Sequence, residues 1–445
     1  MDREVAELVS MQTQTVDKQV VLKAIDSLGR RVTPADVALK TGLPLLPVTA
    51  TLNQIASETN GHMEVGDKGD VAYKFDPGFQ SRYLARGFQE TLQKAWDAVF
   101  KVGFFLVRIS FGVMLILNAI IIVILVFAVI LYFQSRRGDD DDGFGDRGGY
   151  GGGYGGGGFG GFHLSFFDYL LLRDLLFGYP SRTYDRYDYG TPTVRKSKDG
   201  NFFFNAFSFL FGDGDPNQHH EEYKWSMIAE VIRRNKGVVT SEQLAPYLAS
   251  EPSNEDAVLP VLVRFNGRPE VTEDGDIIYV FDDMQVTATA NDSQFRHQLP
   301  TYLSEWTWKF TNVPPGQMVM VYVLAGFNFL GSWFLLSQLG ASVPGYENPL
   351  VAVAPLVHFL VISATLFVAV PLVRWTVLQF KNAKIAERNA KRLANAQLLE
   401  KPPQQVLRKL GSAQRLSLDT RRISENNTIF STEKDSLEQE FDAAP

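Results

Sequence analysis

A chain of 445 residues with a formal net charge of −7 and no cysteine is long enough for about three domains. It cannot form disulfides, zinc fingers or cysteine-ligated iron–sulfur clusters. The negative charge argues against a nucleic-acid-binding protein, because such proteins usually carry a basic face. Residues 1–16 form a polar lead without the features of a signal or transit peptide.

Two stretches of the chain, 206 residues apart, are similar to each other. Residues 60–75 read NGHMEVGDKGDVAYKF and residues 266–281 read NGRPEVTEDGDIIYVF, with eight of sixteen positions identical. In each copy, alternating apolar residues after a Gly-Asp turn predict a two-stranded hairpin, opened by a turn at Asn-Gly. Similarity at one fixed offset indicates an internal repeat.

Three predicted helices precede each hairpin. At the start of the middle helix, Thr240 with Gln243 fits a capping box, and Thr33 with Asp36 fits a looser version of it. The order helix, helix, helix, hairpin resembles a winged helix. We therefore expect a mainly α fold with small β-ribbons, in which an α-helical transmembrane region carries two winged-helix-like domains, 17–77 and 222–283.

Three stretches are long and apolar enough to cross a bilayer core of ~30 Å. The predicted transmembrane helices are 102–133, 318–340 and 349–374, and the last two form a hairpin. Pro355 and Pro371 should bend the third helix.

Amphipathic connectors, 78–101 and 284–317, are expected to lead from each winged-helix-like domain into the membrane. Trp306 and Trp308 in the second connector suit the membrane surface.

The region between the first span and the second winged-helix-like domain is of low complexity. A flexible glycine-rich linker, 134–162, is followed by interfacial segments and loops, 163–221. The apolar stretches 164–177 and 201–211 are too short to span and are interpreted as interfacial or re-entrant helices. His219-His220-Glu221-Glu222 is interpreted as a solvated linker rather than a metal site, because no second cluster completes the ligand shell.

A basic helix, 375–401, is expected after the third span, followed by a disordered tail, 402–445. Its basic residues and the one that ends the span are candidate contacts for anionic lipid: Arg374, Lys381, Lys384, Arg388, Lys391 and Arg392. The positive-inside rule places this C-terminal end on the cytoplasmic side, or on the stromal side of a plastid membrane. The side of the first winged-helix-like domain stays open: a single crossing puts it opposite, unless 164–177 enters the membrane.

The sequence contains no catalytic motif, so we predict that the protein is not an enzyme and has no catalytic residues, cofactor or bound metal. His358, in the third span, is interpreted as a hydrogen-bonding residue between helices. The alternative is an axial ligand to haem or chlorophyll.

The predicted third helices lack the basic charge that a DNA-reading helix needs. Residues 47–59 contain no Lys or Arg, and residues 254–265 contain Glu255 and Asp256 with Arg264 only near the end. We therefore expect a membrane-anchored scaffold or assembly factor that presents winged-helix modules to protein partners. The alternative is a membrane-tethered winged-helix transcription regulator.

Residues 139–192 include the glycine-rich linker and the run DYLLLRDLLFGYPSRTYDRYDYG. They resemble an uncharacterised family of cyanobacterial and chloroplast-envelope membrane proteins that is labelled as an iron–sulfur cluster biosynthesis family. The resemblance implies a multi-pass protein of a cyanobacterial or plastid-envelope membrane. The label implies cysteine ligands, and this chain has none.

Overall fold

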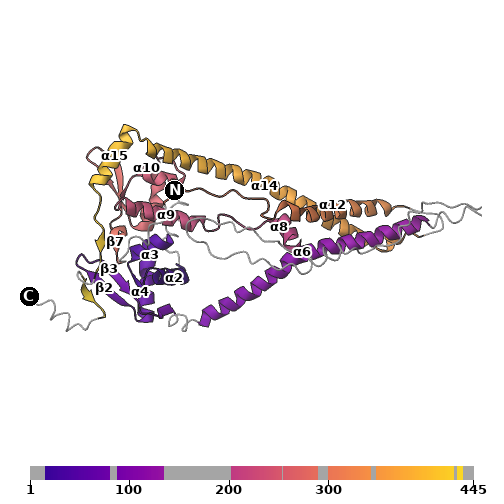
Figure 1. Ribbon diagram of the computed structural model, residues 1–445, viewed down its shortest axis with the longest axis horizontal. Helices are drawn as coiled ribbons and strands as arrows, with labels where there is room; N and C mark the ends of the chain where they lie inside the picture. The colour runs from indigo at the N-terminus through magenta and orange to yellow at the C-terminus, as the bar shows by residue number, and fades with distance from the viewer. Residues whose placement is uncertain are drawn as a thin grey trace, which may run out of the picture.

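The computed structural model describes residues 16–80, 88–134, 202–252, 254–288, 299–341, 347–424 and 428–433, with only the backbone of residues 88–98. The glycine-rich linker after Gln134, the stretch 164–177 and the residues that carry the family resemblance lie outside this part of the chain. The described chain is mainly helical with small sheets. A head of short helices and strands sits at one end, and long helices converge away from it (Figure 1).

The first unit of the head contains three helices and a three-stranded sheet. The elements are α2 (Lys18–Ser27), β1 (Arg31–Val32), α3 (Pro34–Thr41), α4 (Leu45–Thr59), β2 (His62–Gly66) and β3 (Val71–Lys74), and the strand order is β1-β3-β2. Thr33 and Asp36 form both bonds of a capping box, each 3.1 Å long, although the sequence indicated only a looser cap.

The second unit repeats this element order. It contains α9 (His220–Arg234), β4 (Val238–Val239), α10 (Ser241–Leu248), η2 (Glu255–Val258), α11 (Leu259–Phe265), β5 (Arg268–Val271) and β6 (Ile277–Val280). Its strand order is β4-β6-β5. The hairpin registers also correspond, because Met63 lies opposite Tyr73 and Pro269 lies opposite Tyr279.

The two Asn-Gly pairs end helices rather than form the predicted turns. Asn60 and Asn266 adopt left-handed φ values of 57° and 53° as the C-caps of α4 and α11. An added Cβ would lie 2.9 Å from the Phe75 ring at Gly61, and it would lie closer still to the Phe281 ring at Gly267. The matched glycines therefore leave room for a matched core phenylalanine.

The two units share one hydrophobic core. Val37 and Leu52 of the first unit and Ile228 and Phe265 of the second are fully buried in the same cluster. Polar contacts cross the junction as well: Ser226 Oγ donates to Leu39 O (3.1 Å), Arg264 Nε donates to Gly42 O (2.7 Å), and Arg233 pairs with the fully buried Asp36 (3.2 Å).

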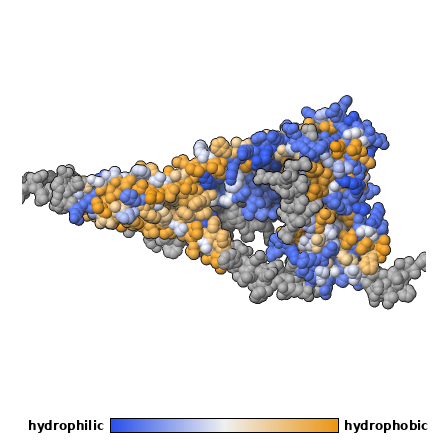
Figure 2. All heavy atoms as spheres, turned by 180° about the vertical axis from the view of Figure 1, so that it is seen from behind, coloured by the Kyte–Doolittle hydropathy of each residue, from blue (hydrophilic) through white to orange (hydrophobic). Residues whose placement is uncertain are grey.

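Among the described residues, three helices are long and apolar enough to cross a membrane: α6 (Phe88–Gln134), α12 (Pro315–Gln338) and α14 (Ala354–Glu400). Apolar side chains cover the surface where these helices converge, whereas polar side chains dominate the head (Figure 2). α6 begins within the predicted first connector, and α14 runs from the third span through the whole basic helix. Pro355 starts α14 rather than bending it, because a proline is accepted in the first turn, whereas Pro371 lies inside the helix.

The short helix α8 (Phe202–Phe211) packs against all three long helices on the side nearer the head. Phe207 contacts Phe104 of α6, and Phe209 contacts Tyr322 of α12 and Phe367 of α14. At the far end, α13 (Pro349–Ala352) closes the bundle, and its Leu350 shares a buried cluster with Val129 and Leu335.

The predicted disorder of the tail is wrong for residues 404–424 and 428–433, which we call the C-terminal arm. The arm forms α15 (Gln404–Arg415), β8 (Arg421–Arg422) and β9 (Thr428–Ser431). β8 pairs with β7 (Val286–Thr287), which follows the short helix η3 (Asp282–Gln285), and β9 extends the first sheet beyond β2. The arm is ordered because Ala413 and Ile423 are buried against the head and because its strands find partners.

Gly42 tests the packing of one unit on the other. Its φ is +70°, and an added Cβ would lie 2.7 Å from the backbone atoms Glu222 O and Ser226 N. Gly29 is a matched control, since its φ is +86° but nothing lies within 4 Å of an added Cβ. Gly42→Ala should be less stable than Gly29→Ala by about 1–3 kcal/mol, the usual range for overpacking. Urea unfolding in detergent, followed by tryptophan fluorescence, measures the difference, and equal stabilities would contradict the shared core.

Candidate functional site

Residues 303–310 of the second connector form no helix or strand, and they lie along α14. No described strand pairs with residues 303–310, and asparagine side chains form the hydrogen bonds to their backbone that a neighbouring strand would form. Asn382 Oδ1 accepts from Trp308 N (2.8 Å) and its Nδ2 donates to Trp308 O (2.9 Å). Asn389 makes the same pair of bonds with Glu305, at 2.8 and 2.9 Å. Asn217 makes them with Trp306, at 2.9 and 2.8 Å.

The spacing of these residues explains why an extended chain fits a helix here. Asn382 and Asn389 are two turns apart on α14, a rise of ~10.5 Å at 1.5 Å per residue. Glu305 and Trp308 are three residues apart in an extended chain, a distance of ~10 Å. Each amide therefore meets one backbone unit of the connector, and none of these groups is left without a hydrogen bond. We call this contact the connector joint.

Two arginines hold the side chain of Glu305 in the connector joint. Arg388 makes a two-point contact with its carboxylate, and Arg392 Nη1 lies 2.8 Å from Glu305 Oε1. The Arg392 side chain is only 5% exposed, so it depends on this carboxylate for its charge balance. The hydrogen bonds from Arg388 lower the pKa of Glu305 to about 2, and the charge of Arg392 acts in the same direction.

The six candidate lipid contacts divide into two groups. Arg374, Arg388 and Arg392 bind the protein itself, and Arg374 Nη1 lies 3.2 Å from the carbonyl oxygens of both Ser208 and Phe209 at the end of α8. Lys381, Lys384 and Lys391 are exposed. Lys381 lies over the Trp308 ring, 4.3 Å from its centroid, and Lys391 pairs with Glu387 at 3.0 Å.

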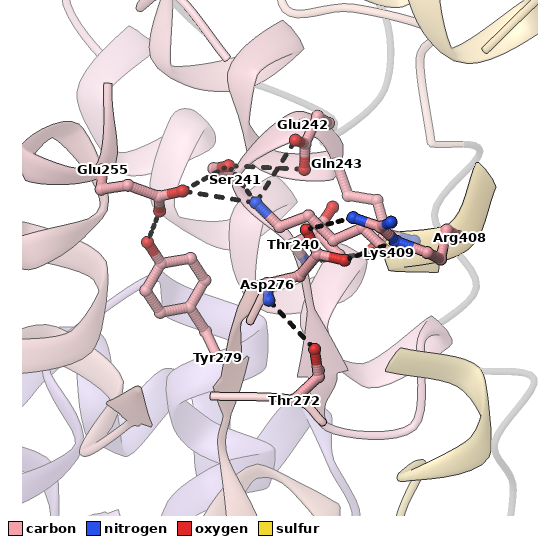
Figure 3. A network of polar contacts seen from close by, with 10 residues as sticks. All are labelled: Thr240, Ser241, Glu242, Gln243, Glu255, Thr272, Asp276, Tyr279, Arg408 and Lys409. Atoms are coloured by element: carbon pink, nitrogen blue, oxygen red, sulfur yellow. Dashed lines mark hydrogen bonds and ion pairs between the residues drawn. The ribbon is translucent and has the colours of Figure 1, made fainter. Parts of the chain in front are cut away.

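The C-terminal arm is fastened to the second unit by a buried lysine (Figure 3). Lys409 of α15 is 8% exposed and reaches Ser241 Oγ (3.1 Å), Glu242 Oε1 (3.3 Å) and Glu255 Oε1 (3.3 Å). Glu255 also accepts a hydrogen bond from the Tyr279 hydroxyl. These contacts satisfy all three donors of the ammonium group, so the network holds α15 in place.

Of the histidines that the sequence singled out, His220 lies near Arg392 and Glu305 of the connector joint. His219 Nδ1 lies 3.3 Å from Glu222 Oε2, and burial together with nearby Arg392 lowers the pKa of His220. Within the described residues no group of His, Cys, Asp or Glu is arranged to hold a metal ion. His358 Nδ1 lies 2.7 Å from Ala354 O of its own helix, and the side chain is exposed.

The third helices of the two units differ in accessibility. α4 carries no basic residue, and its single charge is the partly exposed Glu58; Leu46, Ala50, Asn53 and Ser57 are exposed. α11 lies against the first unit, and its Arg264 stacks on Trp225 with its guanidinium 4.5 Å from the ring centroid. The first unit therefore presents its third helix to solvent, while the second unit uses its own in the shared core.

The connector joint escaped prediction because its key residues look ordinary. Glu305 lies in a connector expected to be amphipathic, and Asn382 and Asn389 are polar positions on a helix expected to be basic and to contact anionic lipid. Their spacing of seven residues on one helix face is the signal that could have indicated a polar seam.

Glu305→Gln tests the connector joint. The substitution removes the charge that Arg388 and Arg392 share, and it should lower stability by about 1.5–3 kcal/mol. Because the folded pKa of Glu305 lies below the ordinary value of 4.5, its contribution is complete above about pH 4.5 and disappears as the pH falls toward 2.

Unfolding of the detergent-solubilised protein as a function of pH measures both effects. Glu387→Gln, on the exposed side of α14, is the control and should change stability little. If Glu305→Gln unfolds like this control at pH 7, the connector joint is not a stabilising contact.

Comparison with known proteins identifies a relative that is similar along nearly the whole chain. It is 32% identical over 442 residues to an uncharacterized chloroplastic protein of Arabidopsis thaliana, in an alignment that covers 95% of this chain and 80% of that protein. No family model and no solved structure matches the chain. A chloroplastic relative and three apolar helices together fit a plastid membrane. Identity of this extent along nearly the entire chain shows common descent, and the chain belongs to the same family as this chloroplastic protein.

Proposed function

We propose that this chain is a membrane-anchored scaffold or assembly factor whose two winged-helix modules form one head for protein partners. One observation carries the proposal: the head keeps one face of the third helix of the first unit, which contains no Lys or Arg, exposed while the rest of the fold fixes its position. α14 continues beyond Arg374 to residue 400, which at 1.5 Å per residue extends about 40 Å from the apolar bundle. A head on such a support reaches partners away from the bilayer surface.

The shared core supports the proposal that both units lie on the same side of the membrane. Both units belong to one head, and α8 meets α6, α12 and α14 at Phe104, Tyr322 and Phe367, on the side of the apolar bundle nearer the head. The proposal therefore places both modules and the C-terminal arm on the cytoplasmic side, or on the stromal side in a plastid. The exposed lysines of α14 lie on the same side, where Lys381, Lys384 and Lys391 can attract anionic lipid.

The competing function, a membrane-tethered transcription regulator, has less support. A winged-helix reader needs a third helix free to enter the major groove with cationic neighbours. Arg264, near the end of α11, is engaged with Gly42 O and Trp225 inside the head. Sequence-selective duplex binding by the full chain at ~150 mM salt, where non-specific phosphate contacts weaken, would favour the regulator. Iron–sulfur chemistry is not part of the proposal, because the chain has no cysteine to ligate a cluster.

Photo-cross-linking tests the scaffold. A photoreactive side chain at Ala50, exposed on α4, should capture the same protein partner in repeated preparations from native membranes. The same group at Gly340, exposed at the far end of the bundle, is the matched control and should not capture that partner. Mass spectrometry identifies the products. Recovery of only the monomer or a homodimer from the Ala50 variant would contradict a scaffold role.

Cysteine labelling tests the arrangement across the membrane, and the absence of native cysteine makes each variant specific. Ser27→Cys in the first unit and Glu273→Cys in the second are both exposed. In sealed vesicles of one orientation, a membrane-impermeant maleimide should label both head variants or neither. It should label Gly340→Cys only in vesicles in which it does not label the head variants. Labelling of Ser27→Cys together with Gly340→Cys, but not Glu273→Cys, would refute the common side.

A further inference from the structure

The two similar sheets differ at their outer edges. In the first sheet β9 of the C-terminal arm pairs with β2, and Glu64 lies opposite Ser431 and Val65 opposite Phe430 (Figure 1). In the second sheet β5 occupies the matching edge position, and no described strand pairs with its outer side. One copy of the repeat has therefore gained a strand that the other lacks.

A single sequence difference explains which edge accepts a strand. The N–H and C=O of Met63 both point to the outer side of β2: Met63 N donates to Thr432 Oγ1 (2.8 Å), and Thr432 N donates to Met63 O (3.0 Å). The residue at the matching position of β5 is Pro269, which lies opposite Tyr279 as Met63 lies opposite Tyr73. Proline has no N–H and blunts an edge strand, so only the β2 edge can pair fully.

The contacts of β9 describe the kind of segment that this edge binds. Thr432 supplies a hydroxyl and an N–H to Met63, and the carboxylate of Glu433 lies 2.6 Å from Lys74 Nζ. Ser431 is small enough to be 9% exposed opposite the buried Glu64. Phe430 shares a face with Val65, because directly opposed residues of antiparallel strands project to the same side. The matching pattern is an aromatic residue, a serine, a threonine and an acid.

β9 itself is held more lightly than the rest of the C-terminal arm. Ile429 is 67% exposed and Phe430 is 47% exposed, so the strand removes little apolar surface from water. Its pairing is also irregular, with a register shift between Val65 and Gly66. α15, in contrast, is anchored by the buried network of Lys409. The arm can therefore release β9 while α15 stays in place.

We propose that the outer edge of β2 is a docking site for an extended segment of a partner protein, which pairs as an antiparallel strand and replaces β9. The segment carries the aromatic-Ser-Thr-acid pattern, and β9 occupies the edge as the chain's own copy of that pattern until the partner displaces it. Main-chain hydrogen bonds give such a complex its affinity, and the alternate side chains give it specificity. The inference rests on the proposed function, because it assigns a binding mode to the partners of the scaffold.

The experiment measures binding of a fluorescent peptide with the sequence of residues 426–434 to the full chain in detergent. Thr432→Pro removes both contacts of the chain's own strand with Met63 and leaves β2 intact. This variant should bind the peptide at least ~10-fold more tightly than the wild type, in which the tethered strand competes at high effective concentration. Thr432→Ser keeps the hydroxyl and the N–H, so it should bind like the wild type. Thr432→Ala is a milder variant if the proline disturbs folding, and it should fall between the two.

Substitutions in β2 test which edge binds. Met63→Pro combined with Thr432→Pro should abolish peptide binding, because it copies the proline of β5, whereas Met63→Ala with Thr432→Pro should retain it. Equal binding by these two double variants, or no binding to Thr432→Pro, would overturn the proposal. Dimers formed by exchange of β9, seen as a doubled mass in light scattering, would assign the edge to a second copy and overturn it as well. If the peptide does not bind while cross-linking from Ala50 still captures a partner, the docking proposal is wrong and the scaffold proposal is retained.

Discussion

The shared core of the two units is the interaction on which the rest of the structure depends. Because the fully buried Val37 and Ile228 belong to one cluster, the two units pack as one body, which supports the proposal that both lie on the same side of the membrane. The same packing encloses Arg264 of α11 against Gly42 and leaves α4 as the accessible third helix. The two similar units therefore form one head with two different faces: the third helix of the first unit is exposed, and that of the second unit packs in the shared core.

Hydrogen bonds and ion pairs of polar side chains join this head to the apolar bundle. An extended connector lying on a helix has backbone groups that no strand satisfies, and an unsatisfied buried group is costly. Asn382 and Asn389 satisfy these groups with paired bonds, and Glu305 forms ion pairs with Arg388 and Arg392. The basic character of α14 therefore has two causes: some of its charges hold the protein together, and others face outward toward solvent or lipid.

Small differences between similar halves decide how the C-terminal arm folds. The hairpins share register and turn geometry, and both tips have a glycine with positive φ, Gly69 and Gly275. Yet Met63 offers an N–H at the outer edge, and Pro269 does not. The path of the arm agrees with this difference. Lys409 anchors the arm on the second unit, and β9 then pairs with the first unit at β2, where Met63 offers its N–H. Within the described residues, the arm therefore pairs with the outer edge of β2 and not with that of β5.

The sequence by itself determined the elements that depend on local patterns. Apolar length predicted three membrane-competent helices, alternation after Gly69 and Gly275 predicted the hairpins, and Thr33 and Thr240 indicated helix starts, because these signals act within a few residues. Only the tertiary structure decided that the units share a core, that Asn60 ends a helix, that residues 404–424 and 428–433 of the tail are ordered, and that Arg388 and Arg392 bind Glu305. Those outcomes depend on contacts between residues far apart in the chain. Nothing in the local sequence distinguishes Ile423 or Glu305. Ile423 is buried against Ala72 and Val286, and Glu305 pairs with Arg388 and Arg392.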